Sequence, residues 1–83
     1  MSPAERAALT RACTSRGFQL LALAPLSPHR LQVFVRACGL TFLVMARAPE
    51  DLAGEPLGEA LLQSAVASLD VLERLQAAAA APN

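Results

Sequence analysis

The pattern of apolar and polar positions predicts a helix at the start of the chain. Small apolar side chains recur at helical spacing along one face of residues 3–15, and polar side chains occupy the opposite face. Ser2-Pro3-Ala4-Glu5 has the spacing of a capping box with proline at the first helical position. Gly17 follows the segment and can adopt the positive φ that ends many helices. We therefore expect a helix over residues 3–15.

Three shorter apolar segments follow, and their length is typical of β-strands. They cover residues 18–24, 30–36 and 40–46, and prolines or glycines separate them. The second segment alternates most clearly, with Leu31, Val33 and Val35 on one face and Arg30, Gln32, Phe34 and Arg36 on the other. The third segment is apolar on both faces, so both of its faces must be covered.

A long apolar stripe predicts a second helix over residues 57–80, ended by Pro82. The centre of this stripe consists of Leu61, Ala65, Leu69 and Leu72. Together the elements predict a single α+β domain over residues 1–83 with the order α-β-β-β-α. We expect a three-stranded antiparallel sheet packed by the two helices.

The chain has more apolar side chain than a monomer of 83 residues can easily hide. Hydrophobic residues make up 54% of it and charged residues 17%, against about 45–50% and about 25% in ordinary domains. Folding of so short a chain buries only about 62% of its surface. This excess predicts a protein partner, either a second copy in a homodimer or a larger subunit. The residues expected at the interface are Leu61, Ala65, Leu69 and Leu72 of the long helix and Phe42 and Val44 of the sheet.

The sequence alone leaves the strand order open. A simple meander places strand 30–36 in the middle, although strand 40–46 is the one most apolar on both faces. A second chain that extends the sheet from the edge of strand 40–46 would resolve this conflict.

No candidate catalytic, metal-binding or cofactor-binding residue emerges from the sequence, so we expect a protein that is not an enzyme and needs no cofactor. His29 is the only histidine, and we interpret it as a solvated loop residue. Cys13, Cys38 and His29 lack the short paired spacings of zinc sites, and a cysteine–histidine nucleophile would lack its orienting third group. Both cysteines are interpreted as small buried residues, and a redox role for either stays open.

The charges are divided unequally along the chain. Residues 1–48 contain six arginines and one acid, a formal charge of +5, whereas residues 49–83 contain one arginine and six acids, a charge of −5. Three interpretations remain open: solvation or pairing at the surface, steering of association, and nucleic-acid binding. The nucleic-acid alternative rests on Arg30, Phe34 and Arg36, because sheet faces that bind single strands combine cations with aromatic side chains.

The sequence predicts neither a targeting segment nor a membrane span. The chain begins without a signal region, and its longest uncharged runs are shorter than the about 18–20 residues of a spanning helix. We expect a soluble, cytoplasmic protein that has no membrane partner. The favoured function is a protein–protein interaction module such as a small adaptor, a chaperone-like protein or an assembly subunit. Nucleic-acid binding is the alternative.

Overall fold

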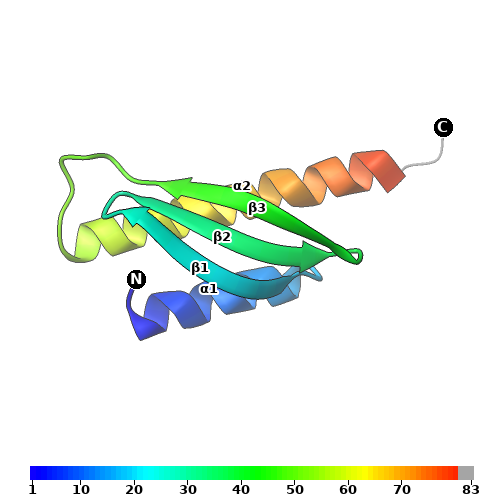
Figure 1. Ribbon diagram of the computed structural model, residues 1–83, viewed down its shortest axis with the longest axis horizontal. Helices are drawn as coiled ribbons and strands as arrows, with labels where there is room; N and C mark the ends of the chain where they lie inside the picture. Colours follow the sequence, from blue (N-terminus) through cyan, green and yellow to red (C-terminus); the bar gives the residue numbers. More distant parts are fainter. Residues whose placement is uncertain (81–83) are drawn as a thin grey trace.

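The computed structural model describes residues 1–80 and contains two helices and a three-stranded sheet (Figure 1). Along the chain the elements are α1 (Pro3–Ser15), β1 (Gln19–Ser27), β2 (Arg30–Ala37), β3 (Leu40–Arg47) and α2 (Glu55–Ala80). The predicted α+β fold with the order α-β-β-β-α is confirmed. The strands end one to three residues later than predicted, and α2 begins two residues earlier. Pro82, predicted to end the last helix, lies outside the described residues.

The helix α1 begins at the capping box that the sequence predicts. The Ser2 backbone N–H donates to Glu5 Oε1 at 2.8 Å, and the Glu5 backbone N–H donates to Ser2 Oγ at 3.1 Å. These two bonds satisfy donors that the first turn of a helix leaves without partners. At the other end Gly17 has a φ of +75°, and the Phe18 N–H donates to the Cys13 carbonyl. The chain therefore turns directly from α1 into the first strand.

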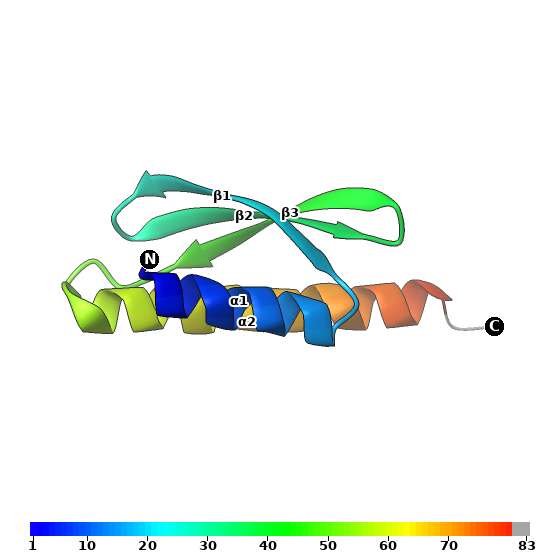
Figure 2. The same cartoon turned by 90° about the horizontal axis from the view of Figure 1, so that it is seen from below.

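The sheet is an antiparallel meander with β2 in its centre. A tight turn joins β2 to β3, and both of its residues, Cys38 and Gly39, have positive φ values of 52° and 76°. This conformation matches the twist of the strands that the turn connects. Both helices lie on one face of the sheet, here called the inner face (Figure 2). None of the described elements covers the opposite face, here called the outer face.

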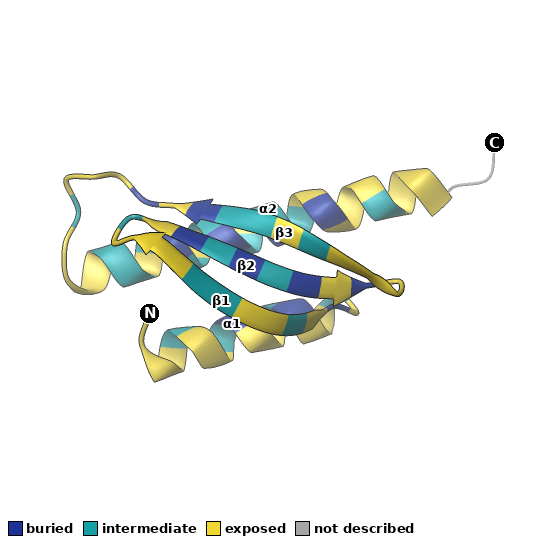
Figure 3. Cartoon of the chain, viewed as in Figure 1, coloured by how far each residue is buried: buried dark blue, intermediate teal, exposed yellow. Residues whose placement is uncertain are grey.

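The core lies between the inner face of the sheet and the two helices (Figure 3). Leu31, Val33 and Val35 of β2 are 4%, 0% and 0% exposed, in agreement with the predicted alternation. Leu9 of α1 and Leu69 of α2 are 0% exposed and belong to the same apolar cluster. The two helices and the central strand thus share one core.

The four α2 residues predicted to form a partner interface lie in this core. Leu61, Ala65, Leu69 and Leu72 are at most 8% exposed, because the sheet of the same chain covers the stripe. Helical periodicity identifies a face that needs cover, but it does not tell which surface provides the cover. Their apolar character is accounted for within one chain, and the exposed apolar side chains lie elsewhere.

The two edge strands of the sheet differ in regularity. The pairing of β1 with β2 contains two register shifts, one between Leu20 and Ala22 and one between Pro25 and Ser27. The pairing of β3 with β2 contains no shift along its whole length. The prediction ended the first strand at residue 24, but the strand continues through Pro25, because an edge strand tolerates a residue without an N–H.

Candidate protein-interaction site

β3 has a neighbouring strand on one side only, and its other side is called the open edge of β3. In an antiparallel pair, alternate residues direct both backbone groups to the neighbour, and the residues between them direct these groups away. Two contacts from α2 show which β3 residues face the open edge. The Arg47 N–H donates to Ser64 Oγ at 2.9 Å, and the Ser68 hydroxyl donates to the Met45 carbonyl at 2.9 Å. The helix thus satisfies the backbone near the C-terminal end of β3.

The rest of the open edge lacks this cover. By the same alternation, Thr41 and Leu43 direct their N–H and C=O groups away from β2. The N–H of Met45 also points away from β2. Within residues 1–80, no hydrogen bond to these groups is found. Between Leu40 and Ala46 the strand also contains neither a proline nor a charged residue. This stretch therefore presents a regular, uncharged backbone edge of the kind that pairs with a further strand.

A groove of about 410 Å³ separates the open edge from α2. In Figure 1, α2 crosses behind β3, and its C-terminal part emerges beyond the open edge. The lining residues are all uncharged, and they are Phe42, Leu43, Val44, Met45, Ser68, Val71, Leu72 and Leu75. The groove thus combines a strand edge with an apolar wall supplied by the helix.

Exposed apolar side chains are concentrated around this groove. Seven large apolar residues within 1–80 are more than 40% exposed, and four of them lie on β3 or on the adjacent turns of α2. The four are Leu40, Leu43, Val71 and Leu75, with exposed fractions of 62%, 49%, 51% and 63%. Clustered apolar exposure on a small protein marks a site of interaction.

The structure brings together only part of the predicted interface. Phe42 and Val44 are half-buried and line the groove, and Leu72 of α2 lines it as well. Leu43 and Val71 also line the groove, but neither was predicted from the sequence. Val71 lies outside the buried stripe of α2. An apolar residue on the side of a helix that faces away from the core is a sequence signal for a binding surface, and it could have identified Val71. The serine contacts to β3 join distant parts of the chain and leave no local signal.

The residues of the nucleic-acid alternative lie together on the outer face of β2. Arg30 and Arg36 are exposed, and Phe34 between them is half-buried. Arg47 of β3 is the register partner of Arg30, so it adds a third arginine to this face. The acidic helix α2 lies on the inner face (Figure 2). The outer face therefore carries positive charge and no acid from any of the three strands.

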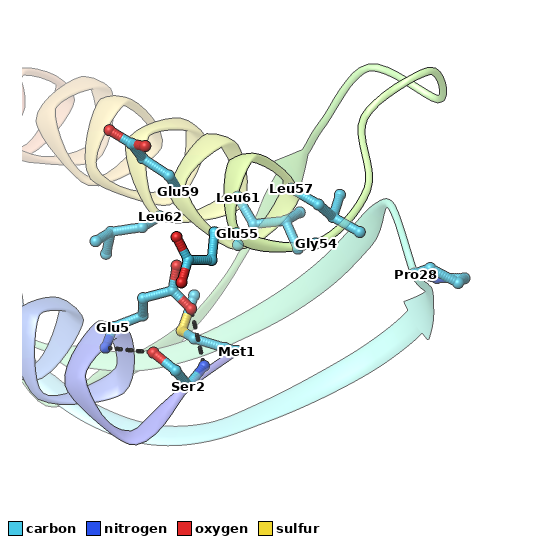
Figure 4. Close-up of a pocket in the computed structure, with 11 residues that line it drawn as sticks. Met1, Ser2, Glu5, Pro28, Gly54, Glu55, Leu57, Glu59, Leu61 and Leu62 are labelled. Carbon is cyan, nitrogen blue, oxygen red and sulfur yellow. Dashed lines mark hydrogen bonds between the residues drawn. The ribbon is translucent and has the colours of Figure 1, made fainter.

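A second cavity, of about 690 Å³, lies between the N-terminal ends of α1 and α2 (Figure 4). Three acids, Glu5, Glu55 and Glu59, are among its lining residues. The hydrogen bonds from the Ser2 backbone and side chain lower the pKa of Glu5. Gly58 allows this carboxylate to approach α2, because a Cβ at that position would lie 2.5 Å from Glu5 Oε2. Glu5 therefore caps the start of α1 and also contacts α2 at Gly58.

The residues considered for chemistry lie apart from one another. His29 lies in the turn between β1 and β2, as predicted, but it is half-buried rather than fully solvated, with Nε2 2.9 Å from the Leu52 carbonyl oxygen. Cys13 is buried, and this burial raises the pKa of its thiol. Cys38 is exposed in the turn between β2 and β3, contrary to the prediction of a buried residue. No three metal-ligating side chains come together within the described residues.

One salt bridge joins the two helices within residues 1–80. Arg16 donates from Nη2 and Nε to Asp70 Oδ1 at 2.6 and 2.9 Å, and from Nη1 to the Ala12 carbonyl at 2.7 Å. The pair connects the C-terminal end of α1 to α2. The pair uses one charge from residues 1–48 and one from residues 49–83. Surface pairing therefore neutralises little of the charge asymmetry between these two segments.

Comparisons of the chain with protein family models, with curated proteins and with solved structures gave no match. None of the helices within residues 1–80 combines the length and the apolar character that crossing a membrane requires.

Proposed function

We propose that the chain is a non-enzymatic protein-interaction module that binds another polypeptide along the open edge of β3 and the adjoining groove. The observation that carries this proposal is the contrast between the two edges of the sheet. Soluble proteins protect edge strands with bulges, prolines and charges, because an unprotected edge pairs with other chains. β1 has two register shifts and Pro25, whereas β3 is regular and uncharged from Leu40 to Ala46.

The groove provides an uncharged surface beside the open edge of β3. A strand added at a sheet edge gains main-chain hydrogen bonds, and it needs an apolar surface for its alternate side chains. Val71 and Leu75 line the groove together with residues of β3, so an added strand in this groove can contact them. Both side chains are more than half exposed in the isolated chain, at 51% and 63%. Covering them with an added strand removes apolar surface from water.

A photo-crosslinking experiment in cells that produce the chain tests this proposal. One variant carries a benzophenone amino acid in place of Leu43, on the open edge of β3. The control carries it in place of Leu26, which is similarly exposed, at 56%, on the protected strand β1. We expect a covalent adduct with a polypeptide at position 43 and little or none at position 26. Absence of an adduct at position 43, or equal yields at both positions, would contradict the proposal.

Nucleic-acid binding is the second candidate function, and the arrangement of charge favours it over the remaining alternatives. Arg30, Arg36 and Arg47 share the outer face with Phe34, and the acidic helix lies on the other side of the sheet. Titration of a fluorescent single-stranded oligonucleotide at several salt concentrations tests this function. If the arginines contact phosphates, replacing Arg30 and Arg36 with alanine weakens binding and reduces the salt slope by about 1.4–1.8, at 0.7–0.9 per phosphate contact. An unchanged slope would exclude these two residues from the site.

A further inference from the structure

We infer that the polypeptide bound at the open edge is a second copy of this chain, paired antiparallel through β3 about a two-fold axis at Leu43. This inference rests on the proposed function and names its partner. The arrangement joins two three-stranded sheets into one sheet of six strands.

The register follows from the backbone groups that α2 leaves without partners. The Arg47 N–H is already bonded to Ser64, so strand pairing at the open edge ends before that residue. The groups that remain available extend from Thr41 to Met45, and Leu43 is the midpoint of this stretch. Leu43 then exchanges two hydrogen bonds with Leu43 of the second copy, and Thr41 pairs with Met45 of the second copy. The Met45 carbonyl accepts from Ser68 and retains a second lone pair for this pairing.

Side chains are complementary at this register. On the inner face, Phe42 of each copy lies opposite Val44 of the other, which makes two apolar cross-strand pairs. Leu40, 62% exposed in the single chain, lies opposite Ala46 of the second copy. On the outer face the two Leu43 side chains meet at the axis. The residues that line the open edge thus find apolar neighbours in a second copy.

The distribution of charge also favours a second copy over a charged partner. The groove contains no charged residue, so it offers no counter-charge to an acidic or basic peptide. The chain has a formal net charge of zero, so two copies approach without net repulsion. Each Arg47 lies four residues from the axis, which places the two arginines about 26 Å apart at about 3.3 Å per residue.

The exposed area is consistent with such a dimer. The chain exposes 5270 Å², about 600 Å² more than the roughly 4,700 Å² expected of a compact monomer of this mass. A standard interface removes about 800 Å² from each partner. The excess is therefore of the same order as the area that each partner loses in a standard interface.

Disulfide trapping with light scattering tests both the partner and the register. The parent variant is Cys38→Ser, because Cys38 is exposed and Cys13 is buried. Adding Leu43→Cys places two cysteines opposite each other, with Cα atoms about 5.5 Å apart, within the range that a disulfide spans. Leu40→Cys is the control on the same strand, because its symmetry mate lies six residues away, at about 20 Å. We expect a covalent dimer for Leu43→Cys, little or none for Leu40→Cys, and twice the chain mass for the parent.

Several results would overturn the inference. A parent mass of one chain up to high concentration would exclude the second copy as the partner. A dimer that crosslinks through Leu40→Cys but not through Leu43→Cys would exclude the register. If the parent is a monomer and photo-crosslinking at position 43 captures a different polypeptide, this inference fails and the proposed function stands. If Leu43→Lys leaves the mass of a parent dimer unchanged and position 43 captures no polypeptide, both fail. Leu26→Lys on β1 is the matched control.

Discussion

Replacing Leu69 with alanine tests whether the apolar stripe of α2 belongs to the core of one chain. Leu69 is 0% exposed and lies in one cluster with Val33 and Val35. Removing a buried leucine side chain costs about 2.7–5 kcal/mol, through lost transfer free energy and the cavity that remains. A chain of this length has a total stability of about 4–12 kcal/mol, so Leu69→Ala removes a large part of it. Leu26→Ala, at a site 56% exposed, costs less than about 0.5 kcal/mol.

Urea unfolding followed by far-ultraviolet circular dichroism measures both variants, because the chain contains neither Trp nor Tyr. With a slope of about 1–2 kcal/mol/M, Leu69→Ala lowers the midpoint by about 1.4–5 M urea. Leu26→Ala lowers it by less than about 0.5 M. Equal midpoints for the two variants would refute the placement of Leu69 in the core. Leu69→Asp would leave a buried charge without a partner and unfold the chain, so it does not test assembly.

Three further predictions concern the contact between the helices and the two thiols. In a Glu5→Ala background, Gly58→Ala should raise the free energy of unfolding by about 0.8–1 kcal/mol through helix propensity. In the native background the gain should be smaller, because the new Cβ meets the Glu5 carboxylate. Equal gains in the two backgrounds, measured by urea unfolding, would contradict this contact. The lowered pKa of Glu5 gives stability that is complete above the ordinary glutamate pKa and is lost as the pH falls through the lower folded value. Between neutral pH and acid below the lowered pKa of Glu5, Glu5→Gln should therefore lose less stability than the native chain, and parallel losses would refute this expectation. Cys38 should react with iodoacetamide in the folded chain, whereas Cys13 should react only after unfolding, because Cys13 is buried and the pKa of its thiol is raised. Mass spectrometry measures the two rates of modification, and equal rates would contradict the burial of Cys13.

Local patterns account for most of the fold. The capping box, the alternation of the central strand and the turn at Cys38 and Gly39 each depend on a few neighbouring residues, and the structure contains all three. The continuation of β1 through Pro25 was not predictable from local rules. It depends on β1 being an edge strand, which only the tertiary arrangement decides.

The candidate site was less accessible to sequence reasoning, because it depends on which surfaces cover one another. The stripe that includes Leu69 has the periodicity of any covered helix face, and periodicity does not distinguish the chain's own sheet from a partner. The bonds from Ser64 and Ser68 to β3 span 17 and 23 residues of sequence, and they decide which part of the strand edge is left open. Phe42 and Val44 were accessible, because apolar residues on both faces of one strand already require cover on both.

The position of α2 after the sheet has a consequence for synthesis of the chain. α2 supplies the cover for the inner face and the serine contacts to β3, yet its 26 residues are translated after all three strands. At about 5–20 residues per second, the ribosome needs roughly 1–5 s to add them. Until α2 packs onto the sheet, a hairpin of β2 and β3 leaves Val33, Val35 and the whole strand edge without the cover that the helix provides. The described fold is therefore completed only when α2, the last of its elements to be made, packs onto the sheet.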